Sequence, residues 1–180
     1  MYKKLILGVF SLLVWIAFLF QGLTLPVQAK TKITPGADVQ ADDKSVREIL
    51  VSFHKAEEFL EARNLDGLMG LYSKDYGYNG LKKDDLRKIW ESLFAEHKKI
   101  ASAHMFSKII VVAGKNPTAD ITCMGSLWAT TVPTGHRVNI DSWFEEEHHM
   151  AYEDGAWRIR GHAGEAPKVL QFGVAPHPLF

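Results

Sequence analysis

The sequence contains a single cysteine, Cys123, so a disulfide bond within the chain is excluded. We expect this side chain to pack as a small buried hydrophobic group. The sequence also lacks an excess of either charge, because 21 basic residues stand against 21 acidic ones. A chain without a basic patch has no electrostatic footprint for nucleic acid, so we expect no nucleic-acid partner.

The common catalytic and cofactor-binding motifs are missing as well. The sequence has no phosphate-binding loop, no dinucleotide fingerprint and no nucleophile elbow, and we expect no cofactor. The acidic and histidine-rich run 145–149 suggests a metal at first sight. Side chains alternate between the two faces of a strand, so Glu145, Glu147 and His149 cannot join Glu146 and His148 at one ion. We therefore expect no metal site.

The N-terminus has the pattern of a secretory signal. Lys3 and Lys4 precede the apolar run 5–20, and the small residues of Val27-Gln28-Ala29 suit a cleavage site. Residues 1–29 are therefore predicted to be a signal peptide of an exported protein, periplasmic or extracellular. An uncleaved membrane anchor is the alternative, because the apolar stretch can be extended to Leu25. Cleavage would leave a net charge of about −2, since the segment carries two lysines and no acidic residue.

The next part of the chain is predicted to be helical. Residues 30–43 are polar around Pro35-Gly36 and predict a flexible linker. Apolar residues at helical spacing then predict three helices. The first runs from a cap at Asp43 to about Arg63, a short second one starts at Asn64, and the third starts at Asp84 or Asp85 and is closed by Lys98 and Lys99.

After Ile100 the hydrophobic pattern changes to the period of a strand. Strands are predicted at 106–112, 119–132, 138–152 and 157–162, and Asp154-Gly155 has the pattern of a tight hairpin turn. Helices followed by an antiparallel meander predict an α+β domain over residues 44–163. Residues 164–180 contain three prolines and predict an irregular tail.

Two sequence blocks resemble a known superfamily. Residues 64–68 (Asn-Leu-Asp-Gly-Leu) and 71–75 (Leu-Tyr-Ser-Lys-Asp) are similar to the junction of the first two helices in NTF2-like (SnoaL-like) proteins, and 154–159 is similar to their final hairpin. The resemblance implies a cystatin-like cone, in which three N-terminal helices pack on a curved antiparallel sheet around a pocket. It also implies a possible homodimer formed through the sheet.

Two enzymatic branches of this fold can be compared residue by residue. The tyrosine and aspartate of ketosteroid isomerases fall on Ala56 and Gly80, which cannot perform that chemistry. Scytalone-dehydratase-like members pair a strand histidine with a helix carboxylate, which His104 and Glu61 resemble. Leu60 replaces the adjacent tyrosine of that branch, and no second strand histidine matches, so the resemblance to this site is partial.

Glu57 is a further candidate catalytic residue. It falls near the centre of the apolar stripe of the first predicted helix. A buried carboxylate has a raised pKa, as a general acid or base near neutral pH needs. Glu57, Glu61 and His104 thus form the candidate catalytic set. A helix end that extends into solvent past the sheet is the alternative.

A second group of residues is expected to line a ligand pocket. Glu146 and His148 share the predicted core face of their strand with Phe144, unless a bulge interrupts the alternation. Trp128, Trp143 and either Tyr76 or Tyr78 could form the walls for an apolar ligand. A place in the core or in a dimer interface is the alternative for these aromatic residues.

Three functions stay open at this point. The first is binding of a small, largely apolar molecule, with no other membrane contact than the signal segment if uncleaved. The second is a cofactor-free acid–base enzyme of the dehydratase or lyase type, and the third is an interaction module that dimerises through its sheet.

Overall fold

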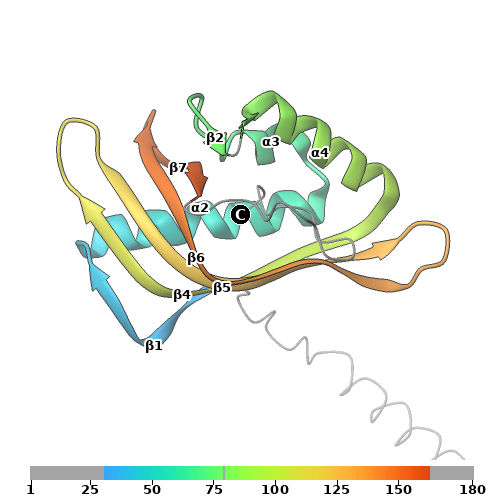
Figure 1. Cartoon of the computed structure of the whole chain (residues 1–180), viewed down its shortest axis with the longest axis horizontal. Coiled ribbons are helices and arrows are strands. Elements are labelled where there is room, and N and C mark those ends of the chain that lie inside the picture. The colour runs from blue at the N-terminus through green and yellow to red at the C-terminus, as the bar shows by residue number, and fades with distance from the viewer. Residues whose placement is uncertain (1–30, 79, 163–180) are drawn as a thin grey trace, which may run out of the picture.

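The computed structural model describes residues 31–78 and 80–162 (Figure 1). The predicted signal peptide and the predicted C-terminal tail lie outside these residues. Within the described part of the chain, no helix is long and apolar enough to cross a membrane.

The described helices begin and end close to the predicted positions. Helix α2 spans Asp43–Ala62, and the Asp42 side chain caps it by accepting a hydrogen bond from the Ser45 backbone. It ends where Arg63 adopts a left-handed conformation with φ 54°. Asn64 caps the short helix α3, Leu65–Met69, and helix α4 spans Lys83–Glu96.

The sheet has five strands in the order β1-β4-β5-β6-β7. Strand β1 is parallel to β4, and the other neighbours are antiparallel. A separate two-stranded hairpin joins β2 and β3. The strands are β1 Thr31–Gln40, β2 Gly77–Tyr78, β3 Leu81–Lys82, β4 His97–Val112, β5 Thr118–Thr131, β6 Arg137–Glu153 and β7 Ala156–His162.

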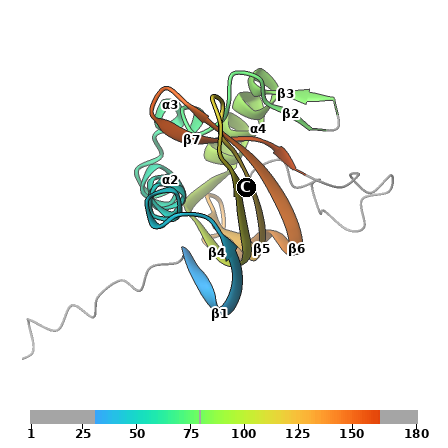
Figure 2. The same cartoon turned by 90° about the vertical axis from the view of Figure 1, so that its left-hand side faces the viewer.

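The expected flexible linker is mostly a strand, which corrects the prediction. Residues 31–40 form β1 along the edge of β4, as Figure 2 shows. Pro35-Gly36 lies where the register shifts between Ile33 and Asp38, and Gly36 has φ 79°. The turn residues therefore interrupt the strand with a bulge and do not end it. Residues 31–40 are polar in sequence but still form a strand, because the backbone of β4 supplies their hydrogen-bond partners.

The end of the third predicted helix also differs. The helix ends at Glu96, and Lys98 and Lys99 belong to β4. Lys99 has φ 54° and lies in the register shift between Lys98 and Ala101. These lysines start the longest described antiparallel pairing and do not complement a helix dipole.

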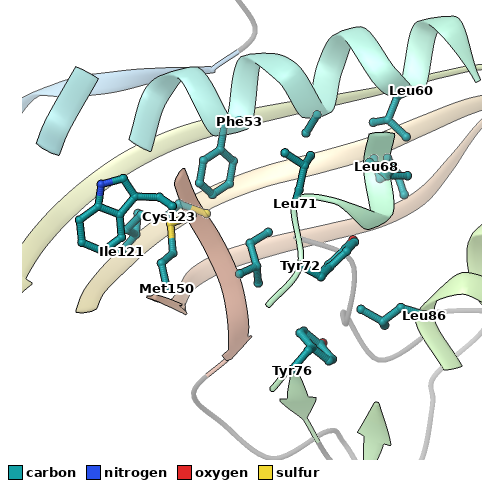
Figure 3. Close-up of a cluster of buried hydrophobic side chains, with 14 of the residues drawn as sticks. Phe53, Leu60, Leu68, Leu71, Tyr72, Tyr76, Leu86, Ile121, Cys123 and Met150 are labelled. Carbon is teal, nitrogen blue, oxygen red and sulfur yellow. The ribbon is translucent and has the colours of Figure 1, made fainter. Parts of the chain in front are cut away.

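The helices cover one face of the curved sheet, which confirms the predicted α+β class (Figure 1). We call the face toward the helices the inner face. Figure 3 shows Phe53 projecting from α2 toward the strands that carry Cys123 and Met150. On β5 the inner residues follow strict alternation, from Ala119 through Leu127 to Ala129.

Strand β6 does not keep a single alternation. Asp141 and Trp143 are buried before Glu145, whereas His148 and Met150 are buried after it. Glu145 has φ 54° and lies in the register shift between the pairs Cys123–Glu146 and Gly125–Trp143. This bulge exchanges the inner and outer residues. The expectation that Phe144 faces the core is therefore wrong, and its surface is 75% exposed.

Candidate functional site

Five polar or polarisable side chains meet on the inner face of the sheet, and we call them the inner cluster. They are Cys123 of β5, Trp143, Glu146 and His148 of β6, and His162 of β7. His148 is fully buried and His162 is 7% exposed. Burial of so many polar groups is costly unless they bond to one another, so the cluster is a candidate site.

Two bulges turn three of these side chains inward. The Glu145 bulge turns Glu146 and His148 to the inner face of β6. On β7, Met150 pairs with Ile159 and His149 pairs with Gly161, so Arg160 is an extra residue between two pairs. Without this bulge His162 would point away from the buried Ile159. The bulge brings it opposite His148 instead.

Two glycines make room for the site. A Cβ at Gly125 would overlap the carbonyl oxygen of Ala103 and the Trp143 indole. The indole therefore lies over the space that a side chain at position 125 would fill. A Cβ at Gly161 would lie 2.6 Å from the Gly77 carbonyl oxygen, so this glycine permits the close approach of β2.

The cluster is connected by three short contacts. The Trp143 Nε1–H donates to Cys123 Sγ at 3.1 Å. Cys123 Sγ lies 2.9 Å from His148 Nε2. On the other side of the same ring, His148 Nδ1 lies 2.7 Å from His162 Nδ1. His148 thus bridges the sulfur and the second histidine, with both ring nitrogens engaged.

Glu146 is the carboxyl group of the cluster. Burial raises its pKa from 4.5 to about 7, and the nearby charge of Asp141 adds to the effect. Its Oε1 lies 4.0 Å from His162 Nδ1. A carboxyl group that titrates near neutral pH beside a histidine can accept or donate a proton under physiological conditions. The arrangement is therefore suited to acid–base chemistry.

Cys123 is not arranged as a nucleophile, although a histidine lies next to it. The residue is fully buried, and burial raises the pKa of its thiol to about 12. The reactive form of cysteine is the thiolate, which this environment disfavours. The sequence-based expectation of a buried small side chain holds, and its contacts with Trp143 and His148 add a polar role.

His104, predicted from the family resemblance, lies beside the inner cluster. It is fully buried on β4, and its ring packs against Phe53 at 4.9 Å and Trp143 at 5.1 Å between centroids. Its centroid is 6.5 Å from that of His148. The structure therefore places this histidine in the wall of the same site.

The two helix carboxylates do not join His104 in the described contacts. Glu57 is half-buried and accepts a hydrogen bond from Thr31 Oγ1 at 2.5 Å, and Thr31 is the register partner of His104. Glu61 is exposed. The inward side of α2 is occupied by apolar side chains, so the carboxylates lie along its borders; the buried ones are Ile49, Phe53, Ala56 and Leu60.

The predicted pocket residues divide between the two faces. Tyr76 is 1% exposed, and its ring centroid lies 6.3 Å from that of His162. Tyr78 is closer, at 5.0 Å. Trp128 lies between the buried Leu127 and Ala129 and so points to the outer face, where Arg137 stacks over it at 4.5 Å. The alternation of β5 corrects its expected place in the pocket.

Described residues line a small cavity in the core and an open groove outside it. A cavity of about 10 Å³ lies between Phe53, Leu71 and Met150, and this volume matches a single water molecule. An open groove of about 300 Å³ lies outside the core along Lys74, Asn116, Glu153 and Arg160. Its charged residues have both signs, so it has no clear preference for one charged ligand.

A group with metal-ligand spacing occurs on the outer face. Ligand atoms of Asp120, Glu147 and His149 lie within 4.8 Å of one another. Glu147 and His149 point away from the inward residues, as strand alternation predicts, and Asp120 joins them from the neighbouring strand β5. In this structure, His149 Nδ1 lies 2.7 Å from Asp120 Oδ1, so the two side chains already bind each other.

The sequence pattern did not indicate His162 or the bridging role of Cys123. The polar residues among the apolar ones in the last two strands were visible in the sequence. Which of them point inward depends on two bulges, which the sequence pattern does not reveal. Positive φ at a glutamate such as Glu145 carries no sequence signature of the kind that glycine gives.

Comparison with known proteins identifies the fold. No protein-family model and no curated protein matches the chain. Among solved structures, a conserved protein from Planctomyces limnophilus matches with a TM-score of 0.54 and 14% identity, over 69% of this chain and 97% of that one. A putative dehydratase of the NTF2-like family from Streptomyces avermitilis has a TM-score of 0.50 and 14% identity, over 67% and 95%.

A third similar structure is a ketosteroid isomerase-like protein from Erwinia carotovora atroseptica. It has a TM-score of 0.50 and 14% identity, over 67% of this chain and 95% of that one. Together these likenesses confirm the NTF2-like fold that the sequence resemblance predicted. At these identities they show the fold and not the function.

Proposed function

We propose that the protein binds a small, largely apolar molecule whose polar group contacts the inner cluster. The observation that carries this proposal is the position of Glu146, whose side chain is 17% exposed while its neighbours in the cluster are buried. It is the member of the cluster that solvent reaches. A ligand there would meet a carboxyl group with a pKa of about 7 and the edge of an aromatic wall.

The surroundings support a mixed apolar and polar ligand. Tyr76 and Tyr78 approach His162 from β2 and the loop before it, and Phe53 approaches His148 from α2. Their rings suit a flat apolar body, and Glu146 suits one hydroxyl or carbonyl group. The cavity of about 10 Å³ beneath Phe53 is too small for this ligand, so the ligand must approach from the side of Glu146.

Binding can be tested first by native mass spectrometry of the full chain, purified after export and under mild conditions. A retained small molecule would give its mass directly. Binding of three probes, naphthalene, 2-naphthol and 2-naphthaldehyde, is then measured by tryptophan fluorescence. We expect the two polar probes to bind at least tenfold more tightly than naphthalene, because only they can bond to the cluster.

The matched variants are Glu146→Leu on the inner face and Glu147→Leu on the outer face. The first should abolish the preference for polar probes, and the second should keep it. The proposal would be overturned if the protein retains no small molecule and binds none of the three probes. A dimer without ligand would then favour an interaction module, for which Phe144 offers an exposed apolar side chain on the outer face.

Acid–base catalysis is the second candidate function, and one observation favours it. Glu146 titrates near neutral pH and lies 4.0 Å from His162, whereas Glu57 and Glu61 do not reach this cluster in the described contacts. A dehydratase or lyase would use Glu146 and His162 for the proton transfers. Glu146→Gln should then bind the retained molecule but fail to convert it, and unchanged conversion would exclude this role.

We also propose that the protein is exported. Cleavage after Ala29 would leave β1 complete, because this strand starts at Thr31. Expression of the full chain in a bacterial host, followed by intact-mass measurement of the exported fraction, should give the mass without residues 1–29. The full mass in a membrane fraction would support the uncleaved anchor instead.

A further inference from the structure

The inner cluster has a direction that its hydrogen-bonding groups determine. An indole Nε1–H can only donate, so the Trp143 contact makes Cys123 Sγ an acceptor at one side. The thiol itself keeps its proton, because burial raises its pKa to about 12. The sulfur therefore has one proton to give, and His148 Nε2 lies 2.9 Å away to receive it.

The thiol of Cys123 is better used as a donor to His148 Nε2 than as an acceptor from it. A neutral imidazole nitrogen is a strong acceptor, whereas a thiol sulfur is a weak one. If His148 Nε2 donated to the sulfur, two N–H groups would be directed at this weak acceptor. The favoured arrangement is therefore S–H donating to Nε2, which leaves the proton of a neutral His148 on Nδ1.

The same reasoning continues to His162. The two Nδ1 atoms lie 2.7 Å apart, and such a bond needs one donor and one acceptor. With its proton on Nδ1, His148 is the donor and His162 Nδ1 is the acceptor. A neutral His162 then carries its own proton on Nε2, and its Nδ1 lone pair is occupied.

We infer that Trp143, Cys123, His148 and His162 form a one-way hydrogen-bond chain that fixes the tautomer of His162, with Cys123 and His148 as positioning residues. The chain deepens the proposed function and relies on it only for the identity of the ligand. With its Nδ1 engaged by His148, His162 is held in one orientation beside Glu146, the member of the cluster that solvent reaches. Glu146, near neutral pH, can serve a ligand hydroxyl.

The test is ¹⁵N NMR of the histidine rings in the ligand-free full chain at pH 8, since protonated and unprotonated ring nitrogens have separate chemical shifts. The signals are assigned with His148→Gln and His162→Gln. We expect the proton on Nδ1 in His148 and on Nε2 in His162. The opposite tautomer at His162, with the proton on Nδ1, would overturn the inference even if the probes bind.

Variants at Cys123 separate positioning from packing. Cys123→Ser keeps a hydroxyl that accepts from Trp143 and donates to His148, so both tautomers should be retained. Cys123→Ala removes the donor, and we expect His148 and His162 to exchange between tautomers. Unchanged tautomers in a folded Cys123→Ala variant would overturn the role of the sulfur. If that variant does not fold, the wild-type tautomers still decide the direction of the chain.

Discussion

His148 and His149 are consecutive residues of β6, yet the sheet places them in opposite environments. His148 is fully buried and contacts Cys123 and His162 on the inner face. His149 has a side chain that is 40% exposed and binds Asp120 on the outer face. Each histidine also has a glutamate in its own cluster, Glu146 inside and Glu147 outside. The same residue types therefore form a buried network on one side and a solvated contact on the other.

The two histidines differ in how much stability the protein should lose when their contacts are removed, because one is buried and the other is exposed. A buried partner that loses its bond keeps the full desolvation cost, because water cannot replace the bond. An exposed partner is solvated and screened by salt, so its loss costs little. The following predictions test this difference, from the largest expected effect to the smallest.

Replacing each histidine by leucine should give the largest difference. His148→Leu leaves the Cys123 thiol and the His162 ring without the partner between them, and we expect a loss of about 2–4 kcal/mol in the free energy of unfolding. His149→Leu, the matched control, should cost no more than about 1 kcal/mol. Urea unfolding of both variants measures the effect, and equal losses would contradict the comparison.

Filling the space at Gly125 should disturb the inner face alone. In Gly125→Ala the new methyl group would overlap the Ala103 carbonyl oxygen and the Trp143 indole, so we expect a loss of about 1–3 kcal/mol. Thermal unfolding and the near-ultraviolet signal of the tryptophans should both change. Gly114→Ala is the control, because no described atom lies within 4 Å of its added methyl group. If Gly125→Ala is as stable as the wild type, the Trp143 indole must lie elsewhere.

Neutralising Glu146 should change the dependence of stability on pH. Its pKa in the folded protein, about 7, is above the ordinary 4.5, so the folded state binds the proton more tightly. The stability from this group is complete below pH 4.5 and is lost as the pH rises through 7. Glu146→Gln should remove this loss, with a gain of about 1–2 kcal/mol at pH 8 after allowance for partial solvent access.

The matched control for this prediction is Glu147→Gln, which makes the same change on the outer face. Urea unfolding at pH 5 and pH 8 measures both variants. The control should keep the pH dependence of the wild type. A Glu146→Gln variant with the same difference between the two pH values as the wild type would show that Glu146 does not cause it.

The smallest effect is expected at the outer contact between His149 and Asp120. Asp120→Asn removes the carboxylate beside His149, in a contact between side chains that are 40% and 46% exposed. At a pH of about 5, where an ordinary histidine is protonated, we expect a loss of about 0.2–1 kcal/mol at low salt that disappears in about 1 M salt. Unfolding measured at the two salt concentrations checks it, and a loss that persists in high salt would show that this contact behaves like a buried one.

The regular parts of the fold were predictable from the sequence. Asp42 and Asn64 cap helices within a residue of the expected starts, and Asp154-Gly155 makes the expected turn, with φ values of 50° and 78°. Strand β5 keeps strict alternation, so Ile121, Cys123 and Leu127 were correctly placed on one face. In these regions local propensity and tertiary packing favour the same conformation.

The candidate site was less predictable, because it depends on features that local patterns do not encode. The bulges at Glu145 and Arg160 decide which of two neighbouring residues points inward, and they reverse the expected position of Phe144 and bring in His162. Likewise, the pairing of residues 31–40 depends on an available strand edge far away in the sequence. His104 and His148 could be named as site residues from the sequence, but their packing beside His162 could not.

The pairing of β1 with the edge of β4 also affects whether two molecules of this protein can pair through their sheets. Strand β1 covers β4 at residues 31–33 and 38–40, where backbone groups would otherwise be open to another chain. An open strand edge is a template for pairing between molecules and for aggregation. A chain shortened past residue 40 would present the 16-residue β4 as such a template. The polar segment 31–40 thus covers the edge of β4 and prevents that edge from pairing with a strand of another molecule.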